Sequence, residues 1–423
     1  MDTAAIKKHI SEDNWYGILK AAGCTTKDVS PEIQEMTKKK DIPTLLNVAI
    51  AYGQLSNLRV IKKKVPGKKR EFNVQEANDC FQNAIALYRH IISLDEKNIM
   101  ALQSMAYVFY KYIIAYFGVN KKEIEQMDNI SILDCFKNMT ETYDALFNLP
   151  LLPPVSEIKA RYRRGKAWSE VLFAPRSASG STIIDTLGVS FYTVRLQAIA
   201  DMMRVLKLYA ALEKKKDLDA AYNVYIKSLY TLGRLFENSV YDNAYTPIQK
   251  EDGENTTIFN EFLKNPEQVD LTKYRPAKNL DYLERAEHCF QAILNAYEIE
   301  RYSPIDMKKL AGESKYPISP RDLFYRFGTL YAKWFLINAI PEKSRRTQVS
   351  KAYVGVYFFF LANEYCLWRR KMNLPTPAFG YITDRLNKLL QAAAIDFYRD
   401  GHIKNMLANF DTVLTKIELP QWP

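Results

Sequence analysis

The sequence predicts an all-α fold, and three observations lead to that class. Apolar residues recur at spacings of three and four in segment after segment, which is the period of an amphipathic helix. Glycine (15) and proline (18) are scarce among the 423 residues, at about 8% against about 12% in average proteins, which disfavours turn-rich β folds. Aromatic residues reach 13% and apolar residues 48%, so the chain can bury a compact core.

The same periodicity places helices along most of the chain. We expect them over residues 42–57, 74–94, 98–118, 130–147, 155–173, 183–213, 217–238, 279–300, 320–338, 346–371, 380–399 and 402–416, with shorter ones before residue 40. Pro150, Pro153 and Pro154 interrupt the pattern, because proline cannot continue a helix and biases the preceding residue to an extended conformation. We therefore expect an N-terminal helical region over 1–150 and a C-terminal one over 151–423.

Two segments are predicted to be insertions between helices. The first covers residues 54–73 and contains a dense run of lysine and arginine, which has to be solvated. The second covers residues 241–278, where four residues that favour turns or breaks, namely Pro247, Gly253, Pro266 and Pro276, interrupt any helical pattern. Each is expected to be a loop.

Internal similarity is the most specific pattern in the sequence. Glu76–Ile85 (EANDCFQNAI) and Glu284–Ile293 (ERAEHCFQAI) share Cys-Phe-Gln and a small residue four positions before the phenylalanine. Other segments share a second pattern, large-x2-large-small-x2-aromatic, whose small residues are Ala49, Ala106, Gly233, Gly328 and Ala394. A small residue lets two helix backbones approach closely, so we expect these five positions to be buried at helix contacts.

These paired patterns resemble the tetratricopeptide-repeat (TPR) family, which stacks 34-residue helix–turn–helix units into a superhelix with a concave binding face. The last unit keeps the family spacing at Leu390, Ala393, Ala394, Phe397, Gly401, Met406, Phe410 and Val413. Elsewhere the paired patterns lie farther apart than in the family. The resemblance implies an α-solenoid of TPR-like repeats with long helices and insertions; an irregular helical bundle is the alternative.

The cysteines and the lengths of the apolar runs indicate the cellular compartment of the protein. The five cysteines are odd in number and form no Cys-x-x-Cys pair, which fits buried reduced thiols better than disulfides or a zinc site. The N-terminal residues hold no apolar run of signal-peptide length, and the longest apolar stretch, around Val354–Ala362, is too short to span a bilayer. We expect a cytoplasmic protein without a membrane partner.

No sequence motif for catalysis or for a cofactor is present. The four histidines are far apart, and no Walker-type, Gly-x-Ser-x-Gly or dinucleotide-binding glycine pattern occurs. We therefore expect no metal, no cofactor and no enzymatic activity. An enzyme whose site is built between distant helices remains the third hypothesis.

Basic clusters supply the candidate binding residues, since the formal net charge is +11 and the pI about 9.1. The first cluster is a basic loop of Lys62, Lys63, Lys64, Lys68, Lys69 and Arg70. The second is a basic helix with Lys159, Arg161, Arg163, Arg164 and Lys166, interleaved with Tyr162 and Trp168. A weaker candidate is an anion-binding loop before a helix, with Arg176, Ser179, Ser181 and Thr182. Solvated surface, helix capping and core packing are the alternative roles of these residues.

Two functions follow as hypotheses. The leading one is a non-catalytic scaffold or adaptor that presents a concave helical-repeat surface to a protein or peptide, as the TPR resemblance implies. The alternative is an RNA-binding helical-repeat protein with a regulatory or defence role, because clustered cations bind phosphates in a salt-dependent way.

Overall fold

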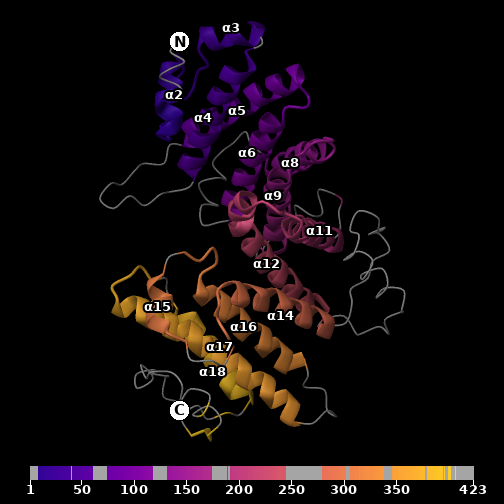
Figure 1. Cartoon of the computed structure of the whole chain (residues 1–423), viewed down its shortest axis with the longest axis vertical. Helices are drawn as coiled ribbons and strands as arrows, with labels where there is room; N and C mark the ends of the chain where they lie inside the picture. Colours follow the sequence, from indigo (N-terminus) through magenta and orange to yellow (C-terminus); the bar gives the residue numbers. More distant parts are fainter. Residues whose placement is uncertain are drawn as a thin grey trace. The chain divides into compact units, whose positions relative to one another are not determined.

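The computed structural model describes residues 8–39, 41–60, 74–117, 131–173, 188, 191–243, 279–301, 305–313, 315–337, 345–376, 379–393, 395, 399–401 and 405. Every regular element in these ranges is an α-helix, and they contain no strand. The all-α prediction is therefore confirmed (Figure 1).

The chain divides into two compact units, residues 1–217 and residues 218–423. Unit 1 contains α2 (Trp15–Ala21), α3 (Pro31–Lys39), α4 (Ile42–Val60), α5 (Val74–Leu94), α6 (Ile99–Phe117), α8 (Ile132–Phe147), α9 (Pro154–Phe173) and α11 (Phe191–Ala210). The break expected at residue 150 separates α8 from α9 inside unit 1.

Unit 2 follows the start of α12 (Lys215–Asn243) and contains α14 (Asn279–Ala296), α15 (Met307–Gly312), α16 (Pro320–Ile337), α17 (Arg345–Lys371) and α18 (Gly380–Ala393). The short helix α15 was not expected from the periodicity. Its six residues are fewer than two turns, and its start depends on a cap, in which the Asp306 side chain accepts a hydrogen bond from the backbone N–H of Lys309.

The helices before the two expected insertions end later in the sequence than expected. Helix α4 runs to Val60 and α12 to Asn243, so the first residues of both expected loops are helical. The physical reason is burial, because Leu55 and Ser239 continue the core-facing side of their helices. The remainder of the two insertions, residues 61–73 and 244–278, lies outside the described residues, as does most of the expected helix over 402–416.

Within unit 1 the helices pack as consecutive antiparallel pairs. Helix α4 packs on α5, α6 on α8, and α9 on α11 (Figure 1). The first helix of each later pair also contacts both helices of the pair before it: α6 contacts α4 and α5, and α9 contacts α6 and α8. In unit 2, α16 packs on α17, and α18 contacts both of them.

Small residues sit at the closest helix contacts, as expected. Ala49, Ala106, Gly233 and Gly328 are buried, whereas Ala394 lies outside the described residues. A Cβ atom on Gly328 would lie 2.6 Å from the ring of Phe359 on α17, so a larger side chain does not fit there. The prediction of close packing at the four described positions is confirmed.

Helix α17 explains the longest apolar stretch of the sequence. All its residues from Gly355 to Cys366 are buried, because α15, α16 and α18 pack on it from several sides. Phe358 stacks on Phe327 of α16 with the ring centroids 4.3 Å apart. Among the described helices, none is long and apolar enough to cross a membrane.

The cysteines are core residues. All five, Cys24, Cys80, Cys135, Cys289 and Cys366, are buried and form no disulfide. Burial raises the pKa of the Cys366 thiol to about 11, with smaller effects from nearby charges, so this thiol stays protonated near neutral pH. The expectation that the cysteines are buried is confirmed.

Candidate functional site

Helix α9 carries the basic cluster of the sequence and divides it between two faces. The helix begins at Pro154, directly after Pro153, and proline is well suited to the first helical position. At 3.6 residues per turn, Arg161 and Arg164 lie on one side. Lys159 and Arg163 lie on the opposite side, because residues four apart share a face.

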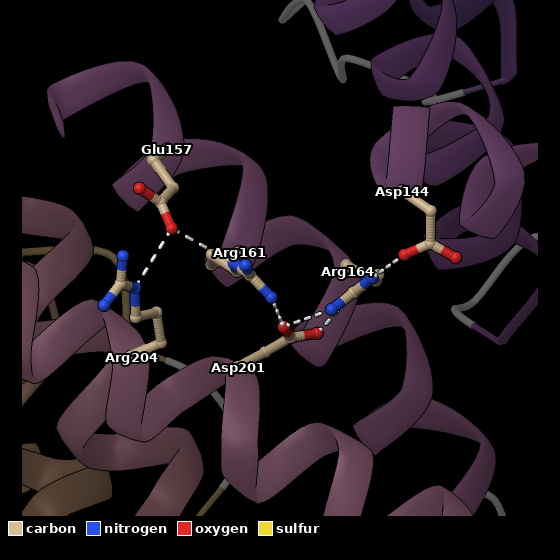
Figure 2. Close-up of polar contacts among 6 residues, drawn as sticks. All are labelled: Asp144, Glu157, Arg161, Arg164, Asp201 and Arg204. Atoms are coloured by element: carbon tan, nitrogen blue, oxygen red, sulfur yellow. Dashed lines mark hydrogen bonds and ion pairs between the residues drawn. The ribbon is translucent and has the colours of Figure 1, made fainter. Parts of the chain in front are cut away.

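The first face of α9 forms an ion-pair network with α8 and α11, which is buried at Arg164 and Asp201 and exposed at Asp144 (Figure 2). The Arg164 guanidinium donates two hydrogen bonds of 2.7 Å to the carboxylate of Asp201 on α11, from Nε and from Nη2. Its Nη1 also donates to Asp144 on α8. Burial alone would lower the pKa of Arg164, but the Asp201 and Asp144 carboxylates raise it above its usual range. The charge of Arg164 is therefore held inside the protein.

Arg161 extends this network to the beginning of α9. Its Nε lies 3.4 Å from Glu157, and its Nη1 lies 3.4 Å from Asp201. Arg204 on α11 donates to the same Glu157 carboxylate at 3.0 Å. With Arg164 and Asp144 included, three arginines face three carboxylates, so the network of Figure 2 is neutral. Such a network joins helices and offers little net charge to a ligand.

A glycine makes this arrangement possible. A Cβ atom on Gly165 would lie 2.9 Å from the Cβ of Asp201 and 3.2 Å from the carbonyl oxygen of Ala198. The absence of a side chain thus lets α11 approach α9 and brings Asp201 to Arg164. The buried Trp168 follows one turn later and packs on Phe136 of α8, with the ring centroids 5.0 Å apart.

Sequence reasoning missed that α9 has the same spacing as the other first helices. Arg161, Arg164, Gly165 and Trp168 match the large-x2-large-small-x2-aromatic pattern with arginine at both large positions. An arginine in a sequence normally indicates a position on the protein surface, so the two arginines concealed the pattern. The spacing of Gly165 and Trp168 was the signal that could have identified α9 as a core helix of this kind.

The second face of α9 meets α6 in a cluster of tyrosines and cations. The Arg163 guanidinium lies over the ring of Tyr107, with Cζ 4.1 Å from the centroid. Lys111 approaches the same ring at 5.3 Å. Tyr110 stacks beside Tyr107, with the centroids 6.0 Å apart. We call Tyr107, Tyr110, Lys111, Tyr143, Lys159, Tyr162 and Arg163 the tyrosine–arginine face.

The charge of Arg163 acts on three tyrosine hydroxyls of this face. Burial raises the pKa of Tyr110, Tyr143 and Tyr162 well above the usual value, and the charge of Glu170 adds to the shift at Tyr162. The positive charge of Arg163 opposes the shift in all three. Tyr143 on α8 is fully buried, and the charge of Arg163 is the largest effect that opposes the rise in its pKa. These hydroxyls stay protonated and can act as donors.

The cations of this face lack acidic partners, in contrast to the network on the other side. Helix α6 has no acidic residue at all. Within the described ranges, no carboxylate forms an ion pair with Lys111, Lys159 or Arg163. Lys166 differs, because its ammonium pairs with Glu170 one turn along α9. The basic helix of the sequence therefore supplies two unneutralised cations, Lys159 and Arg163, to a mostly buried aromatic surface.

The other candidate residues lie outside the described part of the chain. These are the basic loop (Lys62, Lys63, Lys64, Lys68, Lys69 and Arg70) and the anion-binding loop (Arg176, Ser179, Ser181 and Thr182). Among the described residues, no group of three or more His, Cys, Asp or Glu side chains is placed to hold a metal ion.

Comparisons of the chain with family models, with curated proteins and with solved structures give no match. The geometry of the chain itself is therefore the basis of the functional proposal.

Proposed function

We propose that the protein is a non-catalytic binding scaffold that presents the tyrosine–arginine face to a protein or peptide partner. The observation that carries this proposal is the position of Arg163 on the Tyr107 ring, where both side chains are partly exposed and no carboxylate pairs with Arg163. Aromatic and arginine side chains are enriched among the residues that dominate binding energy at protein interfaces.

The packing of the helices supports an α-solenoid of TPR-like hairpins as the framework of this scaffold. In such a solenoid each hairpin contacts its neighbours, and the first helices line one continuous surface. The contacts α4–α6 and α6–α9 fit this arrangement within unit 1. Met100, at the start of α6, is 56% exposed although it is apolar, and it lies on the helix side of Tyr107, seven residues earlier.

Affinity purification from the native host tests the scaffold function. We expect the full chain to recover a stoichiometric protein partner, and we expect Tyr107→Ala combined with Arg163→Ala to lose it. A matched control is Asp384→Ala with Lys388→Ala, which removes an exposed ion pair on α18. Equal recovery by all three chains would place the interaction elsewhere and refute the proposed surface. Circular dichroism should show the same helicity in all three.

A nucleic-acid scaffold is the second candidate function, favoured by the stacked Tyr107 and Tyr110 rings beside cations. Bases stack on aromatic rings, and cations contact phosphates. We expect an RNA-binding chain to lose affinity between about 50 and 200 mM salt, with a slope of roughly 0.7 per phosphate contact. Replacing the six cations of the basic loop by serine should flatten that slope. No binding at about 50 mM salt would eliminate this candidate.

A further inference from the structure

The charge balance of the tyrosine–arginine face points to the chemistry of its ligand. On the opposite face of α9, Arg161 and Arg164 are matched by carboxylates from three helices. Arg163 belongs to the same helix and is met by aromatic rings and hydroxyl groups. Both faces of α9 carry similar cations, so the two faces differ in the groups that meet those cations: carboxylates on one face and tyrosines on the other.

A buried tyrosine interacts with the same guanidinium from inside the protein. The Tyr143 hydroxyl is fully buried, so a ligand on the surface does not reach it directly. The positive charge of Arg163 opposes the rise that burial causes in the pKa of Tyr143, and it acts in the same way on Tyr110 and Tyr162. Tyr143 therefore helps to position Arg163 for an oxyanion.

The number of cations discriminates between kinds of oxyanion. Arg163 and Lys111 of α6 approach the same Tyr107 ring, and Lys159 lies one turn before Arg163 on the same side of α9. No carboxylate among the described residues neutralises these three charges. A carboxylate ligand or a phosphodiester carries one negative charge, whereas a phosphate monoester carries about −1.5 to −2 at neutral pH. The fork of donors in a guanidinium also matches phosphate oxygens.

We infer that the partner presents a phosphate monoester, as on a phosphorylated serine, threonine or tyrosine side chain, to Arg163. This inference rests on the proposed scaffold function and names the group that the scaffold recognises. Tyr107 contributes the ring that orients the guanidinium, and Lys111 and Lys159 add attraction at longer range. Tyr143 is a positioning residue that acts through Arg163.

Binding to two peptide libraries tests the inference with the full chain. The probes are a neutral degenerate peptide library with a central phosphoserine and the same library with serine, both followed by fluorescence anisotropy. We expect the phosphorylated library to bind at least tenfold more tightly and to be displaced by inorganic phosphate. Arg163→Gln should abolish the difference, and Tyr143→Phe, which removes only a hydroxyl, should reduce it several-fold. Lys388→Gln, an exposed cation on α18, is the matched control and should change nothing.

The other outcomes overturn the inference. Equal binding of the two libraries would refute phosphate recognition and leave the scaffold function standing. Failure of the full chain to recover a protein partner in the purification experiment would instead count against the scaffold function itself. Binding of single-stranded RNA more tightly than of the phosphorylated library, with loss in Arg163→Gln, would assign the face to nucleic acid. A phosphorylated library that binds Arg163→Gln as well as the original chain would show that this face is not the site.

Discussion

The guanidinium of Arg164 and the carboxylate of Asp201 form a paired hydrogen bond across α9 and α11, with both donor–acceptor distances at 2.7 Å. The Arg164 side chain is 6% exposed and that of Asp201 is fully buried. Removing one member of such a pair leaves a buried charge without its partner, which is more costly than replacing both members.

We therefore expect Asp201→Asn to lower the free energy of unfolding by about 3 kcal/mol, measured by urea denaturation. Asp384→Asn is the control, because the Asp384–Lys388 pair on α18 is more than half exposed and should contribute less than about 0.5 kcal/mol. Equal losses in the two variants would contradict the structural role of the network.

The close approach of the same two helices depends on Gly165. We expect Gly165→Ala to lower the free energy of unfolding by about 1–3 kcal/mol, because the new methyl group meets the carbonyl oxygen of Ala198, which belongs to the backbone of α11. Gly380→Ala is the matched control, since no atom lies within 4 Å of a Cβ at that position. Urea denaturation of both variants measures the difference, and a stable Gly165→Ala would show that the helices separate at little cost.

Much of the fold was predictable because helix periodicity is a local property. The expected helices over 74–94 and 320–338 agree with α5 and α16 to within one residue at each end. The ion-pair network was not predictable, because its members are far apart in sequence: Asp201 lies 37 residues after Arg164. Only the packing of α9 on α11 decides which arginine is buried.

The division of the basic helix illustrates the same limit for function. The sequence shows Arg161, Arg163 and Arg164 within four residues and predicts one basic surface. The helical period separates Arg163 from the other two, but whether a carboxylate meets each side depends on neighbouring helices. The tyrosines around Arg163 come from α6, α8 and α9, and no sequence spacing connects them.

Glu364 on α17 makes the stability of the folded protein depend on pH. It is 3% exposed, and burial raises the pKa of its carboxyl group to about 7 from 4.5. The folded protein therefore binds this proton more tightly than the unfolded chain, so stability is highest below about pH 4.5 and falls as the pH rises to 7. Across this pH range the free energy of unfolding decreases by about 3 kcal/mol.

Glu364→Gln should remove this dependence, since glutamine has a similar shape and no charge. We expect the variant to gain stability relative to the original chain as the pH rises from 5 to 8. Thermal unfolding at a series of pH values measures the gain. Parallel pH profiles of the two proteins would show that Glu364 stays ionised in the folded state.

The last prediction concerns a second buried ion pair, in unit 2. The Lys333 ammonium of α16 donates to the carboxylate of Glu237 on α12 at 2.8 Å, and the two side chains are 3% and 1% exposed. Arg326 also faces Glu237, at 3.7 Å, but is 22% exposed. Burial lowers the pKa of Lys333, and the charge of Glu237 opposes that shift.

Glu237→Gln should therefore destabilise the protein at pH 7, by about 3–5 kcal/mol, because Lys333 keeps a charge without its carboxylate. Its pKa in the folded state then falls further below the ordinary value of 10.5. The folded variant binds fewer protons than the unfolded chain in this range, so its stability must rise with pH as Lys333 loses its proton. Urea denaturation at pH 7 and pH 9.5 measures this recovery. A Glu237→Gln variant that is no more stable at pH 9.5 than at pH 7 would show that Lys333 reaches solvent. Lys333→Met should be less destabilising than Glu237→Gln at pH 7, because Arg326 still faces Glu237.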